Sequence, residues 1–182
     1  MVIITNFQPP KEIEDLEDRF YNSNGYTNLE ILLTDANCTG ETEWTVDKDC
    51  KVGDTVLFMC AKTAKDHIGH VCAEAKRLGD DELIEFAEEE REKYSKVSGY
   101  LLAIGILEEP PFQSASEFPY QSWRSPWYGK VGDLKLFENP IYIGDFRDFI
   151  IISRTGSITK LTDDQWSQLK RVILGKGNSI RI

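Results

Sequence analysis

The order in which strand-like and helix-like stretches follow one another is the feature that most constrains the fold. Two strongly apolar runs, at residues 55–61 and 100–107, predict strands, and mainly helix-like sequence separates them. The expected strands outnumber the helices and do not alternate with them, which excludes a doubly wound sheet. We therefore expect one α+β domain spanning residues 1–182, with a small mixed, barrel-like sheet and helices beside it. Strands are expected at residues 28–35, 55–61, 100–107, 133–141 and 148–158, and helices at residues 9–20, 68–78, 79–97 and 162–175.

The helix expected near the C-terminal end carries the clearest local signals. Thr162 and Gln165 have the spacing of a capping box, in which each side chain binds the backbone N–H of the other residue. Trp166, Leu169 and Ile173 fall on one face of the helix that follows. This pattern indicates an amphipathic helix with a well-defined start.

Composition limits the setting in which the chain is expected to work. It has 182 residues, 41% apolar and 29% charged, as is ordinary for a globular domain. No run approaches the roughly 20 apolar residues that span a bilayer, and no basic segment precedes an apolar run near the N-terminus as in a signal peptide. We expect a cytoplasmic protein that binds no membrane. Its four cysteines (Cys38, Cys50, Cys60 and Cys72) form no CxxC pair, so we expect reduced thiols, no metal and no cofactor.

Charge is distributed unevenly along the chain. The net charge is -10, which by itself disfavours nucleic acid as a partner. Residues 121–182, however, hold 10 Lys and Arg against 6 Asp and Glu, whereas residues 1–120 hold 11 against 25. One cationic face on an acidic body is therefore compatible with the sequence.

Several catalytic signatures are absent or stand in the wrong context. Residues 67–70 spell HIGH, a signature of one class of aminoacyl-tRNA synthetases, but the parallel nucleotide-binding sheet which that chemistry needs is not predicted. His67 and His70 lie three apart, and no further ligand completes a recognised metal spacing. There is no GxSxG motif, and the GKGNS segment follows a helix instead of preceding one. We assign no catalytic residue and interpret the protein as a binding module.

An aromatic stretch between expected strands is the strongest functional signal. Trp123, Trp127 and Tyr128 occur among Ser, Pro, Gly and Arg residues that predict a loop. One interpretation is a lid that packs these rings onto the sheet. The other is a stacking site, because every nucleobase has a face that stacks on aromatic rings. Arg124 and Lys130 flank the rings and are candidate phosphate contacts.

Segments that together cover about half of the chain resemble EVE domains, which belong to the PUA-like superfamily with the YTH and ASCH domains. Residues 135–169 (KLFENPIYIGDFRDFIIISRTGSITKLTDDQWSQL) are similar to the closing part of that family, and KVGDTVLFMC and GYLLAIGILEEPP are similar to two of its strands. The sequence departs from the family in three places. The usual N-terminal Trp and Arg-Asn stretch ahead of the strand that begins with Gly-Asp is missing, with only Trp44 nearby. Phe58 and Met59 stand where an aromatic pair is usual, and a helical insertion at about residues 66–97 separates two strands.

The resemblance implies a PUA-like pseudobarrel with flanking helices and a pocket that accepts a base. The expected function is recognition of a modified or flipped nucleobase in DNA or RNA, possible roles being defence or the sensing of nucleic-acid modification. The expected base-binding residues are Trp123, Trp127, Tyr128, Phe58, Cys60, Ser153, Arg154 and Thr155, and the expected phosphate-binding residues are Lys62, Arg124 and Lys130.

Two alternatives stay open at this point. ASCH-type relatives hydrolyse nucleosides or RNA, and Lys62 with Thr63 fits such a role in the same pocket. The acidic helical insertion is also suited to docking a basic protein partner, which makes a protein-interaction module the other alternative.

Overall fold

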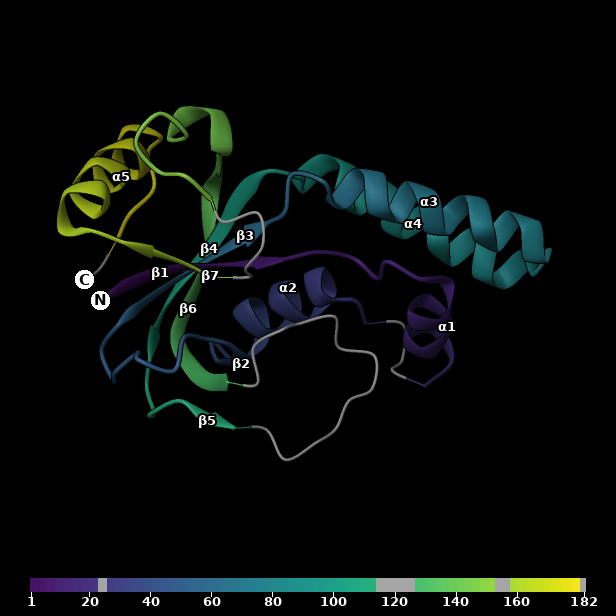
Figure 1. The fold of residues 1–182 in the computed structure, drawn as a ribbon, viewed down its shortest axis with the longest axis horizontal. Coiled ribbons are helices and arrows are strands. Elements are labelled where there is room, and N and C mark those ends of the chain that lie inside the picture. The colour runs from purple at the N-terminus through teal and green to yellow at the C-terminus, as the bar shows by residue number, and fades with distance from the viewer. Residues whose placement is uncertain (23–25, 114–126, 153–157, 181–182) are drawn as a thin grey trace.

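A computed structural model describes residues 1–22, 26–113, 127–152 and 158–180. The described chain is an α+β fold, in which five α-helices surround a curled, mixed sheet of seven strands (Figure 1). The α+β class and the barrel-like sheet expected from the sequence are thus confirmed. No helix in these residues is long and apolar enough to cross a membrane.

The sheet forms a half-barrel with strand order β2–β6–β4–β3–β1–β7, and β5 adds to β6. The pair β1–β3 is parallel, and the other described pairs are antiparallel. The strands are β1 (Val2–Phe7), β2 (Thr42–Thr45), β3 (Thr55–Cys60), β4 (Tyr100–Leu107), β5 (Phe112–Gln113), β6 (Trp127–Tyr142) and β7 (Ile158–Leu161).

The helices largely follow the sequence-based expectations. They are α1 (Ile13–Asn22), α2 (Asn28–Cys38), α3 (Ala64–Leu78), α4 (Asp81–Val97) and α5 (Asp163–Gly175), with a short 3-10 turn η1 (Ile143–Asp145). The capping box of α5 is confirmed. The amide of Gln165 donates to Thr162 Oγ1 at 3.2 Å, and the amide of Thr162 donates to Gln165 Oε1 at 2.9 Å.

Two expected strands are wrong. Residues 28–35 form most of α2, because Leu29 and Leu32, three positions apart, are both buried on one helical face. Of the strand expected at residues 148–158, residues 148–152 form a turn and irregular backbone that buries Ile150, residues 153–157 lie outside the described residues, and Ile158 begins β7. β1 and β2 were not expected at all.

Apolar packing covers both faces of the sheet, which explains the uninterrupted apolar run of β3. Val56, Phe58 and Cys60 point into one core, which includes buried residues of α2, α3 and α4. Leu57 and Met59 point to the opposite core, which α5 and the segment after η1 complete.

The curl brings β2, at one end of the strand order, beside β1, near the other end. Thr5 Oγ1 of β1 donates a hydrogen bond to the carbonyl of Thr45 in β2 at 3.1 Å. The Trp44 ring packs edge-on against Phe7 and Phe58, with ring centroids 5.8 and 5.4 Å apart. These contacts span the interior of the half-barrel and hold it closed.

A second link closes the same gap from outside. Lys160 of β7 reaches Asp47 at 2.9 Å and Asp49 at 3.1 Å, both in the connection that follows β2. Burial raises the pKa of Asp47, but the hydrogen bonds from Lys160 and from the backbone of Asp49, together with the nearby lysine charges, outweigh it, so the pKa of Asp47 lies below its ordinary value. The pair therefore favours the closed half-barrel at neutral pH.

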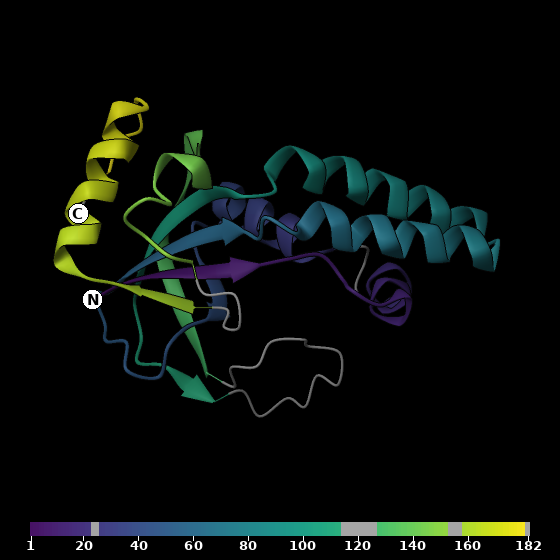
Figure 2. The same ribbon diagram turned by 45° about the horizontal axis from the view of Figure 1, so that its top comes forward.

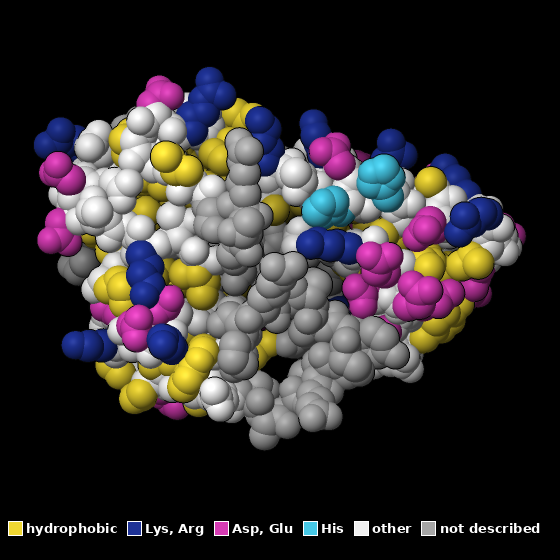
Figure 3. Space-filling view, in the orientation of Figure 1, with side chains coloured by type: hydrophobic (Ala, Val, Ile, Leu, Met, Phe, Trp, Pro, Cys, Tyr) yellow, Lys and Arg dark blue, Asp and Glu magenta, His cyan; other side chains and the backbone are white. Residues whose placement is uncertain are grey.

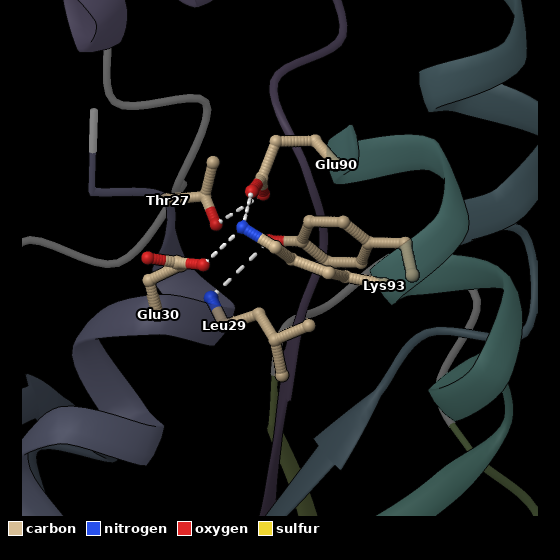
Figure 4. A network of polar contacts seen from close by, with 6 residues as sticks. Thr27, Leu29, Glu30, Glu90 and Lys93 are labelled. Carbon is tan, nitrogen blue, oxygen red and sulfur yellow. Dashed lines mark hydrogen bonds and ion pairs between the residues drawn. The ribbon is translucent and has the colours of Figure 1, made fainter. Parts of the chain in front are cut away.

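The helices α3 and α4 form a hairpin that extends away from the sheet, opposite α5 (Figures 1 and 2). It lies between β3 and β4, which are neighbouring antiparallel strands. The expected helical segment at about residues 66–97 thus takes the form of a projecting hairpin. A buried polar network involving Glu90 and Lys93 ties it to the start of α2 (Figure 4).

Candidate functional site

Three aromatic rings stand where β5 meets the start of β6. Trp127 and Tyr128 open β6, and Phe112 of β5 pairs with Tyr128. The rings of Phe112 and Tyr128 lie 6.5 Å apart at an interplanar angle of 32°. Phe112 is 37% exposed, and Trp127 and Tyr128 are half-buried. We call Phe112, Trp127 and Tyr128 the aromatic edge.

The closure of the half-barrel places this aromatic edge beside β1. Tyr128 of β6 pairs with Thr45 of β2, and the amide of Val46 donates a hydrogen bond to the carbonyl of Trp127 at 3.1 Å. Thr45 in turn accepts the hydrogen bond from Thr5. Only one short strand therefore separates the aromatic edge from the C-terminal half of β1. Strand spacing alone would have placed these segments far apart.

Phe58 and Cys60 lie in the interior of the half-barrel. Both side chains are fully buried, and Trp44 covers Phe58. Burial also raises the pKa of the Cys60 thiol. The two residues thus support the site from beneath, and a ligand reaches them only if the interior opens.

The two described lysines expected to bind phosphate differ in their surroundings. Lys62 is exposed just after β3 and makes no ion pair with any described residue. Lys130 contacts Glu41 at 2.9 Å and Glu108 at 3.5 Å. The hydrogen bond to Glu41, chiefly, raises the pKa of Lys130. Lys62 is therefore the freer cation, and Lys130 is already neutralised by two carboxylates.

Other expected site residues fall outside the described part of the chain. Trp123 and Arg124 belong to residues 114–126, and Ser153, Arg154 and Thr155 belong to residues 153–157. Ile158, the first described residue after residues 153–157, pairs with Thr5 of β1.

One polar group near this site gave no signal in the sequence. Asn6 is the second-last residue of β1 and lies opposite Met59 of the parallel strand β3. Its Oδ1 atom is buried and accepts no hydrogen bond from a described residue. Leaving such an acceptor unpaired costs about 1–3 kcal/mol, so it calls for an explanation. A ligand N–H group bound at this end of β1 would satisfy it.

The HIGH segment lies on α3 of the hairpin, outside any nucleotide-binding sheet. His67 Nδ1 is buried and has no hydrogen-bond partner among the described residues, and burial together with nearby Lys11 lowers the pKa of His67. Within the described ranges, no group of three His, Cys, Asp or Glu side chains is placed to hold a metal ion.

A separate pocket of about 290 Å³ lies where β6 passes α2. It contains none of the residues expected to bind a base or phosphate. Its lining is Ala36, Asn37, Ile104, Leu134, Lys135, Leu136, Phe137, Glu138, Asn178 and Ser179.

Acidic side chains gather over the helical end of the molecule on the face shown in Figure 3. On α4, Glu82, Glu85 and Glu89 are exposed at helical spacing, which gives the hairpin an acidic stripe. No protein-family model and no curated protein matches the chain. Its function is therefore argued from these residues.

Proposed function

We propose that this protein is a nucleic-acid-binding module that recognises a modified or flipped nucleobase, on a fold of the PUA-like pseudobarrel type. The observation that carries the proposal is the aromatic edge, which barrel closure places beside the end of β1. The curled mixed sheet supports the finer fold assignment that the sequence resemblance implies.

The chemistry of the described residues suits an unpaired base. Stacking of a base on an aromatic side chain contributes about 1–3 kcal/mol, and Trp127 and Tyr128 present partly open rings. The Oδ1 of Asn6 is buried, so a base amino or imino group donates a hydrogen bond to it only if this end of β1 opens. Such a buried acceptor discriminates between bases, because a base without the donor leaves it unsatisfied.

The charge pattern favours a short contact with the phosphate backbone. At a net charge of -10, the whole molecule repels a polyanion. Lys62, unpaired among the described residues, supplies a local attraction. We therefore expect modest affinity, with a shallow dependence on salt set by few phosphates.

Titration with fluorescently labelled single-stranded DNA and RNA, each with plain or modified bases, tests this function. Binding is expected, with Trp127→Ala and Tyr128→Ala each weakening it about 5- to 150-fold. The control is Tyr26→Ala, which removes a 45%-exposed ring at the start of α2. Absence of binding to every oligonucleotide, or equal affinity of the Trp127→Ala variant, would refute the proposal. Release of a nucleoside product during the titration would instead favour the hydrolase alternative.

The projecting hairpin supports a second candidate function. Its acidic stripe extends away from the sheet and is accessible to a basic protein surface. Replacing Glu82, Glu85 and Glu89 together with Gln is expected to abolish such an interaction and leave oligonucleotide binding intact. Isothermal titration with a lysine-rich peptide measures the difference.

A further inference from the structure

A second aromatic group lies at the other end of β6 from the aromatic edge. Tyr142 ends β6 and Tyr100 begins β4, and these two residues pair in the sheet. Their ring centroids are 5.1 Å apart at an interplanar angle of 49°. Tyr142 is 39% exposed, and Tyr100 is half-buried. Neither hydroxyl makes a hydrogen bond with a described residue.

The Tyr142 ring packs closely against the backbone of two glycines. A Cβ added to Gly99, which has a φ of +84°, would lie 3.2 Å from Tyr142 Cε2. A Cβ added to Gly144 would lie 2.9 Å from two ring atoms of Tyr142. The ring thus lies against bare backbone at both glycines while part of it stays open to solvent. A tyrosine held in this way offers a contact surface at low entropic cost.

Lys62 stands beside this ring. Its Cγ atom lies 3.7 Å from the position of the added Gly99 Cβ, so Lys62 and Tyr142 border the same point of the backbone. The lysine is exposed and makes no ion pair with a described residue. A fixed ring next to a free cation matches a nucleotide, whose base stacks while its phosphate accepts the positive charge.

We propose that Tyr142, Tyr100 and Lys62 form a stacking step for an unpaired nucleotide on the same strand that presents its base to the aromatic edge. This inference rests on the proposed function. Because the two ring groups stand at opposite ends of β6, the nucleotides that they bind are several positions apart. The stacking step therefore makes the protein a reader of single-stranded or locally opened nucleic acid.

Photo-crosslinking tests the stacking step directly. The probe is a single-stranded oligothymidine in which one position at a time carries 5-iodouracil, a base that crosslinks to stacked aromatic side chains. We expect mass spectrometry to find crosslinks on Tyr142 or Tyr100 and, from other positions, on Trp127 or Tyr128.

Affinity and salt dependence provide the second readout with the same oligothymidine. Tyr142→Ala is expected to weaken binding about 5- to 150-fold, whereas Tyr142→Phe keeps the ring and the affinity. Lys62→Gln is expected to lower the slope of log affinity against log salt by about 0.7, the contribution of one phosphate on a single strand. Lys51→Gln, an exposed lysine at the opposite end of β3, is the control and leaves the slope unchanged.

The outcomes separate this inference from the proposed function. If Trp127→Ala weakens binding, Tyr142→Ala does not and no crosslink forms on Tyr142 or Tyr100, the stacking step is wrong and the base reader stands. If Tyr142→Ala weakens binding and Trp127→Ala does not, Tyr142 stacks on a nucleotide, but the aromatic edge is not the reading site and the proposed strand that joins the two ring groups is wrong. If no oligonucleotide binds, both are wrong.

Discussion

The hydroxyl of Thr27 donates a hydrogen bond to the carboxylate of Glu90 at 2.7 Å, joining two residues 63 positions apart (Figure 4). Glu90 is fully buried on α4, and Lys93 binds both Glu90, at 2.7 Å, and Glu30 of α2. The amide of Leu29 also donates to the hydroxyl of Tyr94 at 3.2 Å. This network fixes the projecting hairpin against α2, and so against the sheet that carries the site.

Lys93→Met is expected to lower the free energy of unfolding by about 3 kcal/mol. That is the lower end of the range for a buried charge left without its partner, because Lys93 itself is 39% exposed. Burial lowers the pKa of Lys93, but its hydrogen bonds to Glu30 and Glu90 outweigh this and raise it to about 12, so the ion pair is present at neutral pH. Lys96→Met serves as the control. Lys96 lies three residues after Lys93 and pairs with the exposed Glu92, so we expect no measurable loss of unfolding free energy in urea denaturation.

The loss in the Lys93→Met variant is expected to shrink in acid. Burial raises the pKa of Glu90, and removing Lys93 takes away an interaction that opposes this rise. A raised pKa means that the folded state holds the proton more tightly than the unfolded state. The destabilisation caused by Lys93→Met is therefore fully present above the pKa that Glu90 has in the folded protein. It disappears as the pH falls below 4.5, the ordinary pKa of a glutamate. Denaturation at pH 4 and pH 7 measures it, and an equal loss at both would contradict a buried carboxylate.

Thr5→Val is expected to destabilise the half-barrel by about 1 kcal/mol, because the Thr45 carbonyl loses the hydrogen bond that links β2 to β1. Thr42→Val is a matched control on β2, since the Thr42 hydroxyl is buried and has no hydrogen-bond partner in the part of the chain that the structure describes. That change is expected to be neutral or stabilising. Amide hydrogen exchange should become faster in β2 and at the start of β6 for Thr5→Val alone. Equal effects of the two substitutions would mean that the Thr5 bond does not hold the sheet closed.

Lys130→Gln is expected to leave the salt dependence of oligonucleotide binding unchanged. The Lys130 ammonium is bound by Glu41 and Glu108, so it displaces few counterions from a nucleic acid. Binding titrations at several salt concentrations measure the slope. A decrease as large as that expected for Lys62→Gln would show that Lys130 leaves its carboxylates to bind phosphate.

Cys38 is expected to react with N-ethylmaleimide much faster than Cys60 at neutral pH. Cys38 is exposed on α2, whereas Cys60 is fully buried in β3 and burial raises the pKa of its thiol. Mass spectrometry of the labelled peptides gives both rates. Comparable labelling would indicate that the interior opens, and a selective rise at Cys60 when oligonucleotide is added would show that binding opens it.

Local sequence signals were sufficient for several elements of this fold. The capping box at Thr162 and the apolar stripe of α5 depend on neighbours a few residues away, so the pattern alone predicted the helix. The strand at residues 100–107 was predicted with the bounds it has, because a long apolar run followed by two prolines has few other solutions. The prediction for residues 28–35 was wrong, because its apolar residues suit either a strand or a helix. Only packing against α4 decides between the two.

Local patterns along the chain were enough to predict the α+β class, the helices with strong periodicity and the ring-rich stretch near Trp127. Which of these parts contact one another depends on how the whole chain packs. The hydrogen bond from Thr5 to Thr45 and the packing of the Tyr142 ring against Gly99 join residues distant along the chain. Helix and strand patterns report the burial of each residue against its near neighbours, whereas the curl of a sheet depends on how all its strands pack together, which no local pattern contains.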